Sequence, residues 1–168
     1  MLTSIALSAA ATLVVATPKV KPPATLPLPS GQTVLHAGQQ PSWRALHSDT
    51  VADLLFTTET LNGRVRFVAR GLKGSTPVTT EDFTPDSVRT WVTTATELVS
   101  SAAPKMGEMR GLGQALTLNV TTATTGETAF GFYVGDAVSD QQLALALTKA
   151  NVVKLTAGVA SALVAVTH

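Results

Sequence analysis

Residues 51–73 read VADLLFTTETLNGRVRFVARGLK, and the Asn62-Gly63 pair near the middle of this stretch predicts a β-hairpin. Asparagine and glycine adopt the positive φ angles that a two-residue type I′ turn requires. We therefore expect one strand over residues 51–61 and a second, antiparallel strand over residues 64–73, with Leu61 opposite Arg64.

This register predicts which side of the hairpin is buried, because successive side chains of a strand point to opposite faces. On the outer face Glu59 lies opposite Arg66 and Leu55 lies opposite Arg70, which indicates a solvated surface with one favourable ion pair. The core face is expected to carry three cross-strand pairs, namely Phe56 with Ala69, Thr58 with Phe67 and Thr60 with Val65.

The second strand of the hairpin carries the concentrated positive charge of the chain. We give the name "arginine face" to Arg64, Arg66 and Arg70, which share one side of this strand, with Lys73 slightly beyond and Arg44 expected nearby. A solvated outer surface, partly neutralised by Glu59, is the simplest interpretation of these charges. As a binding surface, the arginine face would suit an anionic partner such as a lipopolysaccharide head group or an acidic protein.

Four further segments predict strands. Residues 33–37 and 43–47 are short candidates ahead of the hairpin, separated by glycine and proline. Residues 115–122 alternate leucine and valine with threonine and asparagine, which is typical of a half-buried strand. Residues 128–135 place phenylalanine and valine at every second position, so a strand is expected there as well.

The clearest helix signal follows the hairpin. Thr84 is a suitable N-cap, Pro85 suits the first helical position, and Pro104 is expected to end the helix. Apolar residues recur at the spacing of one helix face. They are Val88, Trp91, Val92, Ala95, Leu98, Val99 and Ala102.

Residues 141–148 have two interpretations. Leucine at every second position predicts a strand, whereas Ser139 and Asp140 are suitable caps for a helix. We favour the strand, because Thr148 can then cap a final helix, and the alternative is one long helix from Asp140. The buried side of the final helix is expected to carry Val152, Leu155, Val159, Ala162 and Val166.

These elements predict an α+β domain with a mostly antiparallel sheet of five to seven strands and two helices packed on one face. The expected order is β(β)β-β-α-β-β-β-α, since short links favour antiparallel neighbours. Residues 31–168 are expected to form this single domain, because the chain of 168 residues suits one hydrophobic core.

The N-terminal segment predicts export. Residues 1–17 are uncharged and include an apolar run with small residues at a cleavage site after Ala16. As a helix these residues span about 25 Å, short of the roughly 30 Å bilayer core. We therefore expect residues 1–16 to be a signal peptide, with a membrane anchor within residues 1–17 as the alternative. Residues 17–30 are rich in proline and are expected to form an extended linker, so the expected location is secreted or periplasmic.

Composition excludes several classes of protein. Hydrophobic residues make up 45% and charged residues 14%, which is too apolar for a disordered chain. A net charge of +1 gives no field that would attract nucleic acid, so no nucleic-acid partner is expected. The absence of cysteine excludes disulfides, thiolate metal sites and cysteine nucleophiles. We expect neither a cofactor nor a metal ion.

No sequence motif predicts catalysis. Two imidazoles, His36 and His47, lie near the carboxylates of Asp49 and Asp53, but their spacing matches no metal-binding motif. The run His47-Ser48-Asp49 contains the residue types of a catalytic triad, yet adjacent side chains of a strand point to opposite faces. The glycine-rich segment 104–113 follows a helix and enters a strand, whereas phosphate-binding loops do the reverse, so it is expected to be a flexible surface loop.

We therefore expect an exported, non-catalytic binding domain that recognises a protein, an envelope component or a small apolar ligand through the arginine face or a sheet edge. Contact with a membrane is expected only through an uncleaved N-terminal segment. The alternative is a secreted hydrolase that uses His36 or His47.

Overall fold

The computed structural model describes residues 42–138 and 141–166. Eight strands and two helices lie within these residues, and each half of the chain has four strands followed by one helix. In chain order the elements are β1 (Arg44–Val51), β2 (Leu54–Leu61), β3 (Arg64–Gly71), β4 (Val78–Thr79), α1 (Pro85–Ser100), β5 (Met109–Leu112), β6 (Leu116–Thr122), β7 (Thr128–Gly135), β8 (Gln142–Leu147) and α2 (Lys149–Val164).

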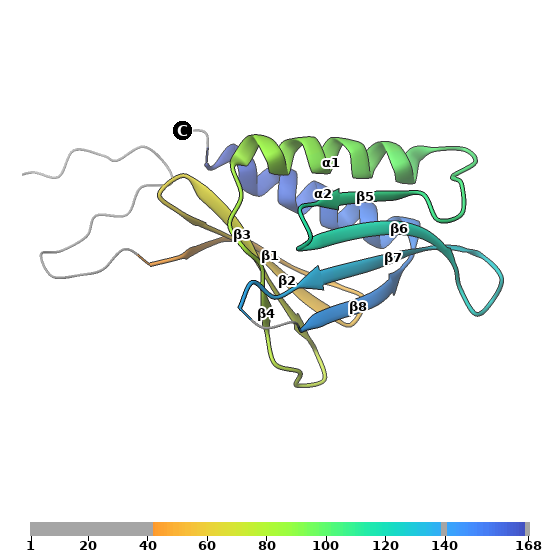
Figure 1. The fold of residues 1–168 in the computed structure, drawn as a ribbon, viewed down its shortest axis with the longest axis horizontal. Coiled ribbons are helices and arrows are strands. Elements are labelled where there is room, and N and C mark those ends of the chain that lie inside the picture. The colour runs from red at the N-terminus through yellow and green to blue at the C-terminus, as the bar shows by residue number, and fades with distance from the viewer. Residues whose placement is uncertain (1–41, 139–140, 167–168) are drawn as a thin grey trace, which may run out of the picture.

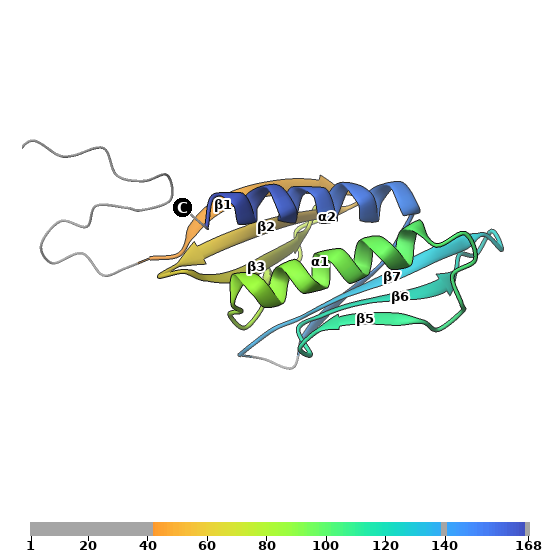
Figure 2. The ribbon, with the colours of Figure 1, turned by 90° about the horizontal axis from the view of Figure 1, so that it is seen from above.

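The strands form two four-stranded antiparallel sheets, ordered β1-β2-β3-β4 and β5-β6-β7-β8. Figures 1 and 2 show α1 and α2 side by side along one side of the sheets. The α+β class with antiparallel strands and two helices is therefore confirmed. The strand count and the single sheet differ from the expectation, because eight strands divide between two sheets, with α1 inserted between β4 and β5.

The β2–β3 hairpin has the predicted register, with Leu61 opposite Arg64 and every other pair following from it. Asn62 and Gly63 have φ angles of 50° and 73°, as the tight turn requires. The long strand predicted over residues 51–61 is wrong, because the chain turns at Ala52, whose φ is 51°, so that Val51 ends β1 and Leu54 begins β2.

The strand predicted over residues 43–47 is the first part of β1, which runs on to Val51. The strand predicted over residues 33–37 lies outside the described residues, as do the predicted signal peptide and linker. Within the described part, neither α1 nor α2 has the length and hydropathy that crossing a bilayer would take.

Helix α1 begins as predicted. The Thr84 side chain accepts a hydrogen bond from the Ser87 backbone N–H at 3.2 Å, and Pro85 is the first helical residue. The helix ends at Ser100, four residues before the predicted stop at Pro104, and the Ser101 N–H closes it by bonding the Glu97 carbonyl. Five residues of the predicted apolar side are buried, namely Val88, Trp91, Ala95, Leu98 and Val99. Val92 is partly buried, and Ala102 lies beyond the helix and is exposed.

Two strands, β4 and β5, have no counterpart in the sequence-based expectation. Strand β5 lies within the segment predicted to be a flexible loop, and its four residues pair with β6. Only Leu112 in it is buried, so the segment shows no apolar alternation that would reveal a strand. Strand β4 has only two residues and forms because Val78 and Thr79 pair with β3.

The second half of the chain follows the prediction closely. Strands β6 and β7 lie where they were expected, and β8 confirms a strand over most of residues 141–148 in place of a long helix. Thr148 caps α2 by accepting a hydrogen bond from the Asn151 N–H at 3.3 Å. Four of the five residues predicted for the buried side of α2 are buried, and Val166 is partly buried beyond the helix.

Buried aromatic rings connect the two sheets and α1. The ring of Phe56 on β2 lies 5.2 Å from that of Phe67 on β3 and 5.7 Å from that of Phe132 on β7, measured between centroids. Trp91 of α1 belongs to the same core. Fully burying one such aromatic side chain contributes about 3 kcal/mol relative to leaving it exposed.

Each helix packs on strands from the other half of the same chain. The two helices pack against each other. Among the strands, α2, which follows the second set, packs chiefly along β1, whereas α1, which follows the first set, packs chiefly against β5. The view from above shows α2 over β1 and β2 (Figure 2). Each helix thus covers strands from the other half.

Candidate functional site

The arginine face lies on the side of the first sheet that points away from the helices. On β3, Val65, Phe67 and Ala69 are fully buried in the core. Arg64, Arg66 and Arg70 alternate with them and must point to the opposite side, because adjacent strand residues do so.

Arg66 is held in place from two directions. Its Nε donates a hydrogen bond to Glu59 Oε2 at 2.8 Å, which confirms the predicted cross-strand ion pair. Its guanidinium also lies 4.2 Å from the centroid of the Trp43 ring, in a cation–π contact. Trp43 was not predicted to belong to this surface. The only signal for it was the expected strand over residues 43–47.

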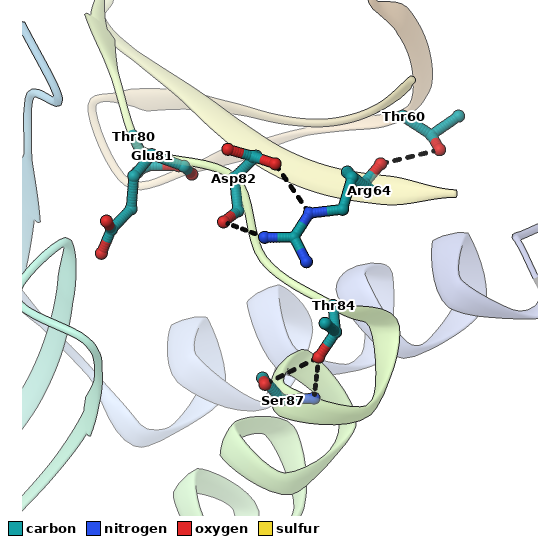
Figure 3. A network of polar contacts seen from close by, with 7 residues as sticks. All are labelled: Thr60, Arg64, Thr80, Glu81, Asp82, Thr84 and Ser87. Atoms are coloured by element: carbon teal, nitrogen blue, oxygen red, sulfur yellow. Dashed lines mark hydrogen bonds and ion pairs between the residues drawn. The ribbon is translucent and has the colours of Figure 1, made fainter. Parts of the chain in front are cut away.

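Arg64 connects β3 to the segment that leads into α1. Its Nε donates to Asp82 Oδ2 at 2.7 Å, and its Nη2 donates to the Asp82 carbonyl at 2.9 Å (Figure 3). The hydrogen bond from Arg64 lowers the pKa of the Asp82 carboxyl below its ordinary value. Arg64 thus forms a two-point contact next to the Thr84 cap, and this contact fixes where the chain crosses from the sheet to the helix.

Arg70 and Lys73 are exposed, and neither forms an ion pair with another described residue. Arg44 lies opposite Thr60, which is the neighbour of Glu59 on β2. Glu59 pairs with Arg66, and adjacent strand residues point to opposite faces of the sheet, so Arg44 and Arg66 lie on opposite faces. The structure therefore keeps Arg64, Arg66 and Arg70 on one side of β3, with Lys73 in the turn beyond the end of the strand and Arg44 on the other side of the sheet by register.

His47 forms a second polar cluster between β1 and α2. Its Nε2 lies 2.6 Å from Asp49 Oδ2, and Lys154 Nζ of α2 lies 3.8 Å from Asp49 Oδ1. Lys154 also donates to the Thr50 carbonyl at 2.8 Å. Ser48 bonds instead to a threonine on β2, so the three adjacent residues do not form a triad. His36 lies outside the described residues.

The backbone of α2 comes very close to this cluster at Gly158. A Cβ atom on Gly158 would lie 2.2 Å from Asp49 Oδ2 and 2.8 Å from His47 Nε2. The missing side chain is therefore what lets the helix lie over the His47–Asp49 pair. Sequence reasoning identified His47 and Asp49, but neither Gly158 nor Lys154, which lie about a hundred positions further along the chain and give no local signal.

A polar cleft of about 480 Å³ opens where the ends of β4 and β7 meet the β5–β6 turn. The described residues of its lining include the carboxylates of Glu81 and Asp136 and the amides of Gln114 and Gln142, and none of them is a histidine or a basic residue. Across residues 42–138 and 141–166, no three histidine or acidic side chains converge closely enough to hold a metal ion.

Comparison with known proteins adds no relative: no family model matches the chain, and neither a curated protein nor a solved structure is significantly similar to it.

Proposed function

We propose that this chain is an exported, non-catalytic binding domain that captures an anionic partner on the arginine face. The observation that carries the proposal is the charge balance of this surface. Four cations, Arg64, Arg66, Arg70 and Lys73, stand against three carboxylates. Two of these, Glu59 and Asp82, are paired with Arg66 and Arg64. The third belongs to the exposed Asp53, whose carbonyl accepts a hydrogen bond from the Leu72 N–H beside Arg70 and Lys73, so one positive charge is in excess. Export is supported by the apolar residues 1–16 and the proline-rich residues 17–30.

The paired and the unpaired cations have different roles in this proposal. Arg64 and Arg66 are anchored by their carboxylates, so they give the surface a fixed shape. Arg70 and Lys73 offer hydrogen-bond donors to a phosphate or carboxylate without first breaking an ion pair with a described residue. Because these side chains are exposed, binding is expected to weaken as salt rises.

The test compares two double variants of the full chain. Arg70→Ser with Lys73→Ser removes the unpaired charges of the face, and Lys105→Ser with Lys149→Ser removes the same charge from elsewhere on the surface. The probes are purified lipopolysaccharide, as an anionic head group, and polyglutamate, as an acidic polypeptide.

At about 1 kcal/mol for each basic residue near an anionic surface, the first variant should bind about 30-fold more weakly at low salt. The control variant should bind like the unaltered chain, and the melting temperature of both should stay close to that of the unaltered chain. Equal binding by the two variants would exclude the arginine face as the binding surface.

A second candidate function is a secreted hydrolase, and the hydrogen bond between His47 and Asp49 is the observation that favours it. An imidazole oriented by a carboxylate is the base of hydrolytic triads. Replacing both His36 and His47 with glutamine would abolish ester hydrolysis if this function is correct. Unchanged hydrolysis in that variant would exclude it.

A further inference from the structure

Strand β8 is an edge strand whose outward hydrogen-bonding groups can be identified. Asp136 and Gln141 continue the β7–β8 register, and the Asp136 N–H donates to the Gln141 carbonyl at 2.9 Å. In an antiparallel ladder, bonded and non-bonded pairs alternate along the strand. The odd-numbered residues of β8 therefore bond to β7, and Gln142, Ala144 and Ala146 direct their backbone N–H and C=O groups outward.

These outward groups have no hydrogen-bond partner within the described part of the chain. An open row of backbone donors and acceptors is a template on which another strand can pair. Native proteins usually protect such an edge with charge, proline, a bulge or a very short strand.

The other three sheet edges carry such protection. Strand β1 has a register shift between Ala45 and His47, carries charged side chains and is packed by α2. Strand β4 has two residues, and β5 has four residues that include Arg110. Strand β8, in contrast, has six residues without charge, proline or a shift in register.

The sequence of β8 is also symmetric. Residues 143–147 read Leu-Ala-Leu-Ala-Leu, which is the same in both directions. Leu143 and Leu145 are partly buried against the core on one face, and Ala144 and Ala146 are exposed on the other. An antiparallel pair of two such strands places leucine opposite leucine and alanine opposite alanine.

We propose that β8 pairs with β8 of a second copy of this chain, joining two four-stranded sheets into one of eight strands across a two-fold axis. The axis passes beside Leu145, which lies opposite its own copy. Ala144 bonds to Ala146 of the second copy and Ala146 to Ala144 of the second copy, which makes four backbone hydrogen bonds. In the dimer the outward backbone groups of both β8 strands are hydrogen-bonded, so no open β8 edge remains and association stops at two copies.

The first test measures the mass of the full chain by sedimentation velocity over a range of concentrations. Ala144→Pro removes an outward N–H, and Ala144→Lys adds a charge at the paired edge. Thr121→Lys is the matched control, because Thr121 lies on an inner strand of the same sheet. Both Ala144 variants should weaken the dimer at least about tenfold, and the control should not. A monomer at every concentration, or a series of larger assemblies, would overturn the proposal.

The second test introduces one cysteine at a time into β8. Because the chain has no cysteine of its own, a disulfide between two copies then reports which residues lie opposite each other. Two non-bonded residues directly opposite each other have Cα atoms about 4.5 Å apart, within disulfide range, whereas diagonal neighbours are about 7–8 Å apart. Under mild oxidation Leu145→Cys should give a covalent dimer, and Ala144→Cys should not. Efficient cross-linking of Ala144→Cys alone, or of neither variant, would contradict the proposed pairing.

Discussion

Replacing Gly158 with alanine tests how closely α2 packs on β1. The new methyl group would lie 2.2 Å from Asp49 Oδ2 and 2.8 Å from His47 Nε2, both well inside van der Waals contact. Both side chains would have to move, and their mutual hydrogen bond of 2.6 Å would be disturbed. Alanine at this position therefore has a steric cost, although it is the better helix former.

The gain in helix propensity from alanine can be compared with the steric cost of its methyl group. Alanine stabilises a helix interior by about 1 kcal/mol relative to glycine. Inserting a methyl group into a closely packed contact costs about 1–3 kcal/mol. We expect the free energy of unfolding to fall by about 1 kcal/mol, which corresponds to a melting temperature about 3–5 °C lower for a domain of this size.

Urea unfolding followed by circular dichroism measures this change, with Ser161→Ala as the control for helix propensity at an exposed position of α2. The sharper readout is a double-mutant cycle with Asp49→Ala, which removes the nearest clashing atom. In that background Gly158→Ala should cost less, because only the contact with His47 remains and its ring is no longer held by Asp49. If Gly158→Ala stabilises the unaltered chain, or if Asp49→Ala leaves its effect unchanged, the close packing described above is wrong.

Three further predictions concern the hairpin turn and the start of α1. Gly63→Ala should lower the free energy of unfolding by about 1–2 kcal/mol in urea titrations, because the residue has a positive φ; no loss would contradict the turn. Thr84→Ala should lower it by about 1 kcal/mol through loss of the N-cap, and an unchanged midpoint would contradict the capping role. Arg64→Gln should raise the pKa of Asp82 toward its ordinary value in an NMR titration. Because Arg64 lowers that pKa in the folded state, the contact contributes to the free energy of unfolding above the ordinary carboxyl pKa, and this contribution is lost as the pH falls through the folded pKa. The Arg64→Gln variant should lose this dependence of stability on acid pH. An unchanged Asp82 pKa in the variant would refute the contact.

Local signals explain which parts of the fold were predictable. Asn62-Gly63 and the Thr84-Pro85 start of α1 specify their conformations within a few residues, and both have the predicted form. Alternation of leucine left residues 141–148 open between a strand and a helix, and the capping signal of Thr148 favoured the strand that β8 forms. Strand β4 could not be predicted, since two residues carry no period and become a strand only through pairing with β3.

The candidate site was predictable to a similar extent. The hairpin register alone placed Arg64, Arg66 and Arg70 on one face. The partners that distinguish these residues, such as Asp82 for Arg64, come from segments whose position depends on how the chain returns to the sheet. Sequence reasoning therefore identified the surface but could not show which of its cations are already paired.

Because each helix packs on strands from the other half, neither half of the chain has its own helical cover during folding. The sixteen residues of α2 cover β1, so an N-terminal fragment that lacks them leaves this surface exposed and is expected not to fold stably. Cleavage between α1 and β5, however, should leave two pieces that hold each other through these helix–strand contacts. Co-expressed as separate polypeptides, they should reassemble, while either one alone should aggregate.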